Sequence, residues 1–73
     1  MTEIDAERAE RVARAHACVS CKEYSYRKVS VRASTPSMRE ALGEVWHAVL
    51  VCGVCGLQQE LGIDAEGDVV YVS

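Results

Sequence analysis

Two pairs of cysteines constrain the fold of this chain more than any other feature. Cys18 and Cys21 form one Cys-x-x-Cys pair, Cys52 and Cys55 form the other, and thirty residues lie between the pairs. A chain of 73 residues buries too little apolar surface for a secure core unless a metal, disulfides or a partner stabilises it. Because the sequence contains no Phe and only one Trp, we expect the cysteines to supply that stabilisation.

The compartment in which the chain resides decides between a metal and disulfides. The first residues, "MTEIDAERAERVARAHA", are too charged for a signal peptide, which needs a continuous apolar stretch. No segment approaches the length of about eighteen apolar residues that a membrane span requires. We therefore expect a cytoplasmic protein without a membrane partner. In a reducing compartment, close cysteine pairs indicate metal ligands before disulfides.

Residues 1–17 predict an α-helix. Thr2 is a candidate N-cap, with Asp5 reaching back as in a capping box. Two acid-before-base pairs four residues apart support the helix. They are Glu7–Arg11 and Glu10–Arg14. One side of the helix carries only alanines and a few larger apolar residues, so it buries little, and we expect it to lie on the domain or on a partner.

Residues 18–73 predict an antiparallel sheet of three to four strands that contains one short helix. The segments "EYSYRKVSVRAS", "EVWHAVLVC", "GLQQELGID" and "EGDVVYVS" have the β-branched and apolar content of strands. Between the first two, "TPSMREALG" offers Thr35 as a cap, Pro36 at the first helical position and Gly43 as a stop. The sequence therefore predicts a small, metal-stabilised, mainly antiparallel β domain at 18–73 after an N-terminal helix at 1–17.

Four thiolates at this spacing suit zinc. A Cys-x-x-Cys turn points both sulfurs at one point, and two such turns complete a tetrahedral site. "CGVCG" has glycine after each cysteine, where the turn needs unusual backbone angles and a close approach of an amide to sulfur, whereas "CVSCK" has Val19 and Lys22 there. We predict one zinc ion per chain. Its ligands are Cys18, Cys21, Cys52 and Cys55. His16 and His47 are not needed as ligands, since four thiolates fill the site.

The two pairs, Gly56 and the strand order resemble the zinc-ribbon family over about residues 18–63. That resemblance implies a zinc-ribbon fold and a binding role, often within transcription or translation machinery. Gly53 replaces the proline that is usual in the family. The same pairs also resemble the iron-binding turns of rubredoxins, which implies, as the alternative, a one-electron carrier with iron in the site. The lack of a glycine after Cys21 and the scarcity of aromatic residues favour zinc.

The segment "EYSYRKVSVRAS" contains a candidate partner-binding face. Strand alternation places Tyr24, Tyr26, Lys28 and Arg32 on one side. The apolar residues of this segment change sides midway, so either a bulge lies near Arg27 and Lys28 or the face with the tyrosines and cations is exposed. An exposed face of rings and cations suits an acidic protein or single-stranded nucleic acid. In the alternative reading, both tyrosines belong to the core and the cations balance the charge of the metal site.

The distribution of charge narrows the choice of partner. The net charge is -3, residues 18–39 carry five bases and one acid, and residues 40–73 carry six acids and no base. Because the acidic part repels a phosphate backbone, we expect weak nucleic-acid binding at most and favour a protein partner slightly. The sequence has no Gly-rich phosphate loop and no partnered Ser–His–Asp arrangement, so we expect neither enzyme activity nor a small-molecule substrate.

Overall fold

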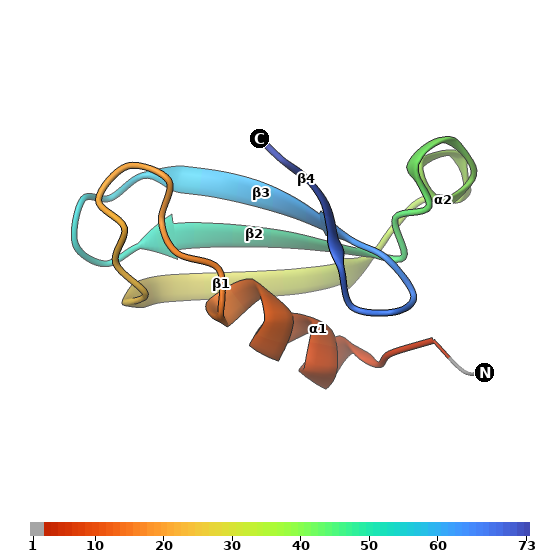
Figure 1. Ribbon diagram of the computed structural model, residues 1–73, viewed down its shortest axis with the longest axis horizontal. Helices are drawn as coiled ribbons and strands as arrows, with labels where there is room; N and C mark the ends of the chain where they lie inside the picture. Colours follow the sequence, from red (N-terminus) through yellow and green to blue (C-terminus); the bar gives the residue numbers. More distant parts are fainter. Residues whose placement is uncertain (1–2) are drawn as a thin grey trace.

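Four antiparallel strands form one sheet whose spatial order, β1-β2-β3-β4, follows the order of the chain (Figure 1). The computed structural model describes residues 3–73. The strands are β1 (Tyr26–Ala33), β2 (Trp46–Cys52), β3 (Gln58–Ile63) and β4 (Val69–Val72). The prediction of a mainly antiparallel sheet of three to four strands after an N-terminal helix is thus confirmed, with four strands.

Helix α1 spans Ala6–Arg14 and precedes the sheet. Its N-cap is Asp5, whose carboxylate accepts a hydrogen bond from the Arg8 amide at 2.8 Å. The helix therefore begins four residues after Thr2, the predicted cap, which lies outside the described residues. Both predicted acid–base pairs along the helix form, at 3.2 Å each. Asp5 caps the helix because its carboxylate reaches the amide three residues on, as N-cap side chains do.

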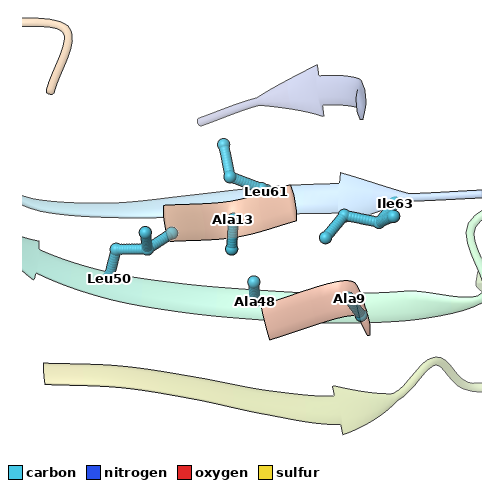
Figure 2. Close-up of a cluster of buried hydrophobic side chains, with 6 residues drawn as sticks. All are labelled: Ala9, Ala13, Ala48, Leu50, Leu61 and Ile63. Carbon is cyan, nitrogen blue, oxygen red and sulfur yellow. The ribbon is translucent and has the colours of Figure 1, made fainter. Parts of the chain in front are cut away.

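Helix α1 packs on one face of the sheet rather than on a separate partner. Ala9 and Ala13 are fully buried against four side chains of β2 and β3 (Figure 2). Those four are Ala48, Leu50, Leu61 and Ile63. Trp46 lies at the edge of this core, and its indole nitrogen donates to the carbonyl of Ile4 at 2.8 Å. Because alanine is small, these two residues let the helix approach the sheet closely. The close packing offsets part of the apolar burial that large aromatic residues would otherwise supply.

A bulge interrupts the alternation of β1 between Tyr26 and Lys28. Tyr26 lies opposite Cys52, whereas Lys28 lies opposite Val51, so these two residues of β1 point to opposite faces. Beyond the bulge, Val29 and Val31 pack on the core under α1. Of the two alternatives that the sequence allowed, the structure has the bulge, and it separates the two residues that strict alternation had placed together.

Helix α2 spans Pro36–Leu42 and connects β1 to β2 at the end of the sheet (Figure 1). The side chain of Thr35 accepts a hydrogen bond from the Met38 amide at 3.3 Å, and Gly43 ends the helix in the left-handed region at φ 72°. The predicted cap, first residue and stop are thereby confirmed. Helix α2 buries none of its residues. Among residues 3–73, neither helix is long and apolar enough to cross a membrane.

Candidate metal centre

The four cysteines lie together at the end of the sheet opposite α2. Their sulfurs are within 4.8 Å of one another. The closest pairs are Cys18 with Cys55 at 3.6 Å and Cys21 with Cys52 at 3.5 Å. These separations are too long for a disulfide, and the thiols are free. They approach the sulfur–sulfur distance of roughly 3.8 Å that a tetrahedral site with Zn–S bonds of about 2.3 Å requires. The cluster can hold one metal ion.

The pairing of β1 with β2 brings the two cysteine loops together. The first loop joins α1 to β1, and the second is the turn between β2 and β3. Cys52 is the last residue of β2 and lies opposite Tyr26, the first residue of β1. A backbone hydrogen bond of 2.7 Å from Gly53 to Ser25 extends that contact beyond the strands. The sheet thus brings together four cysteines that are distant in sequence.

Glycine is favoured at each of the two positions of the second loop for a different geometric reason. Gly56 has a φ of 77°, in the left-handed region that disfavours other residues, and its amide donates to the carbonyl of Cys52 at 3.1 Å. Gly53 has an ordinary φ, but a Cβ there would lie 2.9 Å from the carbonyl oxygen of Ser25. The prediction of unusual backbone angles is therefore confirmed at Gly56 only. The close approach at Gly53 is to the backbone of Ser25 and not, as predicted, of an amide to sulfur.

The first loop repeats this geometry without glycine. The amide of Lys22 donates to the carbonyl of Cys18 at 2.9 Å, as Gly56 does to Cys52. Lys22 has a φ of 63° and is the only residue other than glycine among residues 3–73 with positive φ. The two loops are therefore similar in backbone conformation, although one has lysine where the other has glycine.

Backbone amides favour the thiolate form of the first cysteine in each loop. The amides two and three positions further along point at its sulfur; for Cys52 these contacts measure 3.4 and 3.5 Å. These amide hydrogen bonds are the largest influence and lower the pKa of Cys18, and that of Cys52 to about 6, against the opposing effect of burial. Two of the four sulfurs are thus prepared to bind a cation.

The pKa of Cys21 is shifted in the opposite direction. A hydrogen bond from the backbone of Glu23 lowers its pKa, but burial and the three neighbouring thiols together outweigh this bond and raise the pKa to about 12. A group of four close sulfurs does not carry four negative charges alone, because like charges repel one another. A divalent cation removes that obstacle, so metal binding must release protons from the cluster.

Gln59 supports the cysteine cluster and was not identified from the sequence. It is buried on the α1 side of β3, where its side-chain oxygen accepts from the Val19 amide at 3.4 Å. Its side-chain nitrogen lies 3.2 Å from the hydroxyl of Tyr26, which in turn donates to the carbonyl of His16. This chain of contacts fixes the first cysteine loop against the sheet. Nothing in the sequence indicated this role, because Gln59 is one of two adjacent glutamines in a segment with ordinary strand composition.

The four residues predicted to bind a partner do not share one face. Tyr26 lies on the α1 side of the sheet, half-buried, whereas Lys28 and Arg32 are exposed on the opposite side. Tyr24 precedes β1 and is 61% exposed. The bulge at Tyr26 and Lys28 is the physical reason, because it reverses the side on which every later residue of β1 points.

A second polar cluster lies on the uncovered face of the sheet, away from the sulfurs. Its members are Glu44, His47, Glu60 and Tyr71. The Tyr71 hydroxyl donates to Glu44 Oε1 at 2.7 Å, and His47 Nδ1 lies 3.1 Å from the same oxygen. His47 Nε2 lies 2.6 Å from Glu60 Oε1. Both ring nitrogens of His47 therefore face carboxylate oxygens.

This cluster keeps a buried negative charge next to a neutral phenol. Burial alone would raise the pKa of Glu44, but hydrogen bonds from Tyr71 and His47 outweigh it and hold that pKa below the usual value. Burial, followed by the hydrogen bond to Glu44, raises the pKa of Tyr71 to about 12. The sequence did not reveal the cluster, because its members are far apart and each alone is typical of a solvated residue. A histidine within the apolar "EVWHAVLVC" was the one available signal.

Comparison of the chain with protein-family models, with curated proteins and with solved structures found no match. The interpretation of the cysteine cluster therefore rests on its own geometry and chemistry.

Proposed function

We propose that the chain is a small zinc-ribbon module in which one structural zinc ion supports a surface that binds a protein partner. The observation that carries the proposal is the convergence of four sulfurs at spacings close to those of a tetrahedral zinc site. Zinc bound there would cross-link the two cysteine loops and contribute on the order of 10 kcal/mol to folding. Such a contribution is large for a chain whose core is built mainly of alanine, leucine and isoleucine.

Metal analysis of the purified protein tests the structural part of this proposal. We expect one zinc ion per chain, and we expect a chelator to abolish the far-ultraviolet circular dichroism of the folded protein. Cys21→Ser should lose zinc, whereas Ser20→Ala, a change of an exposed residue in the same loop, should retain it. A metal-free protein that keeps its structure would contradict the proposal. A red protein that takes up iron in preference to zinc would support the one-electron carrier instead.

Exposed cations along β1 and exposed apolar side chains at the tips of the cysteine loops support the binding part of the proposal. Four exposed cations lie between the first cysteine loop and the end of β1, and none of them forms an ion pair with any carboxylate among residues 3–73. They are Lys22, Arg27, Lys28 and Arg32. At the tips of the two loops, Val19 and Val54 are 48% and 61% exposed. A partner with acidic and apolar side chains complements this combination.

Binding of two probes at two salt concentrations tests the kind of partner. We expect an acidic peptide to bind in a salt-dependent way, more tightly than a labelled single-stranded oligonucleotide of equal length. Lys28→Ala/Arg32→Ala should weaken peptide binding. A control, Arg8→Ala/Arg11→Ala, removes equal charge from α1 and should not. If the oligonucleotide binds more tightly and the Lys28/Arg32 variant weakens it, the partner is nucleic acid. If neither probe binds at low salt, this surface has no such role.

A further inference from the structure

A cavity of about 180 Å³ is lined by residues at the α2 end of the sheet. Figure 1 shows that α2 lies at the opposite end of the sheet from the cysteine loops. Its walls come from the end of β1, the first turn of α2 and the beginning of β2. The lining residues are Arg32, Ala33, Ser34, Thr35, Met38, Glu44 and His47. A cavity of roughly 150 Å³ can hold benzene, so this one has room for a small organic molecule.

Two polar side chains, a carboxylate and an imidazole, are buried in the cavity wall. Glu44 is 1% exposed and His47 is 8% exposed. The hydrogen bonds that Tyr71 and His47 make with Glu44 both involve Oε1. A carboxylate can accept about four hydrogen bonds on its two oxygens, so Oε2 keeps acceptor capacity. His47 contacts Glu44 through Nδ1 and Glu60 through Nε2, and Glu44 is the carboxylate that lines the cavity.

Ser34 adds an unsatisfied hydroxyl to the same wall. Its Oγ is buried and makes no hydrogen bond within the usual limits with residues 3–73, although it lies near enough to contribute to the lowered pKa of Glu44. Buried hydroxyls in native proteins nearly always have a partner. A hydroxyl beside a buried carboxylate can donate to that carboxylate and still accept a hydrogen bond from a ligand, because it has one donor and two acceptor sites.

Arg32 supplies a positive charge to the same cavity. It lies opposite His47 in the pairing of β1 with β2, and it forms no ion pair with any carboxylate among residues 3–73. The cavity thus combines a guanidinium and a carboxylate that do not neutralise each other directly. Ala33 and Met38 form an apolar part of its wall.

We infer that this cavity binds a small zwitterion of the size of a free amino acid. The carboxylate of the ligand would pair with the Arg32 guanidinium, and its ammonium group would donate to Glu44 and Ser34. A site with opposite charges and little net charge favours a dipolar molecule over a simple anion or cation. The apolar wall fits a short aliphatic side chain. The cavity lies at the opposite end of the sheet from the cysteine loops, and it shares only Arg32 with the proposed partner-binding surface.

Titration of the metal-loaded protein with alanine tests the inference. Alanine has the same number of non-hydrogen atoms as benzene, and backbone amide NMR shifts would follow its binding. We expect saturable shifts around Ser34 and His47. N-acetylalanine lacks the ammonium group and alaninamide lacks the carboxylate, so each should bind about tenfold more weakly or worse. If alanine gives no saturable shifts, or if one of the two derivatives binds equally well, the zwitterion site is wrong.

Substitutions in the cavity provide the second half of the test. Arg32 is exposed, so Arg32→Gln should leave the fold intact. It should weaken alanine binding about tenfold. Ser34→Ala should weaken it less, because it removes one hydrogen bond without a charge. Lys28→Gln removes a cation from the same face of β1, outside the cavity, and should change nothing. Equal effects of Arg32→Gln and Lys28→Gln would mean that general charge, and not a site, attracts the ligand.

Discussion

At the scale of single residues, the two cysteine loops differ at one informative position. Lys22 and Gly56 occupy equivalent places after the second cysteine of each pair, and both have a left-handed backbone with φ of 63° and 77°. Glycine adopts this conformation at no steric cost, whereas a residue with a Cβ pays about 1 kcal/mol or more for it. The first loop therefore contains local strain that the second loop avoids.

We predict that Lys22→Gly stabilises the metal-loaded protein by up to about 1 kcal/mol. Relief of the left-handed strain favours the variant, and the greater freedom of glycine in the unfolded chain reduces the gain. Chemical denaturation at saturating zinc measures the change. Lys22→Ala removes the same charge but keeps a Cβ, so it should give no comparable gain. Equal stabilisation by both variants would assign the effect to charge and not to backbone conformation.

At the scale of elements, β4 is attached to the sheet by polar as well as apolar contacts. It is a strand of four residues, and Val69 is its side chain in contact with the core. On the opposite face, Tyr71 joins β4 to the segment before β2 through Glu44. The ring of Tyr71 covers Gly62, where a Cβ would collide with it and would lie 2.7 Å from Glu44 Oε1. Glycine at this position makes room for the contact.

We predict that Tyr71→Phe destabilises the protein by about 1–3 kcal/mol, because it removes a donor from a buried carboxylate. The wild-type protein should also lose stability between about pH 10 and pH 12. In that range the unfolded chain releases the tyrosine proton while the folded protein retains it, since the pKa of Tyr71 is raised to about 12. Chemical denaturation across this range, at constant zinc, measures both effects.

The exposed Tyr24 is the matched control for this experiment. Tyr24→Phe should have little effect on stability and should keep the alkaline loss, whereas Tyr71→Phe should remove the part of that loss due to Tyr71. Ultraviolet absorbance of tyrosinate in the folded protein provides a separate readout of the same ionisation. If the two variants respond to pH in the same way, the phenol of Tyr71 does not hold β4 as described.

At the scale of the whole molecule, the features that could be predicted from the sequence are those set by local chemistry. The spacing of the cysteines predicted one cluster of four sulfurs, and Thr35, Pro36 and Gly43 predicted the ends of α2. Strand content predicted the sheet. Each of these features leaves a local pattern in the sequence: a Cys-x-x-Cys pair, a set of helix-capping residues or a β-branched segment. The two cysteine pairs are distant in sequence, but their number and ligand type indicated that they belong to one site.

Other features depend on packing between distant segments and could not be predicted. The bulge at Tyr26 shifts the register of β1 against β2, and the alternating pattern allowed it without requiring it. Asp5 and Thr2 are both good caps, but α1 starts after Asp5, where Ile4 is held by a hydrogen bond from Trp46. The cluster around Glu44 joins residues from separate elements, and no local pattern marks it.

The sequential order of the strands has a consequence for how quickly the chain can fold. Each strand pairs with its neighbour in sequence, so the sheet can grow by successive hairpins without a long-range crossover, which is the kind of topology associated with rapid folding. Because the pairing of β1 with β2 places Tyr26 beside Cys52, we expect the two cysteine loops to meet after this hairpin has formed. Capture of the ion is therefore expected late on the folding route, where it slows unfolding more than it accelerates folding.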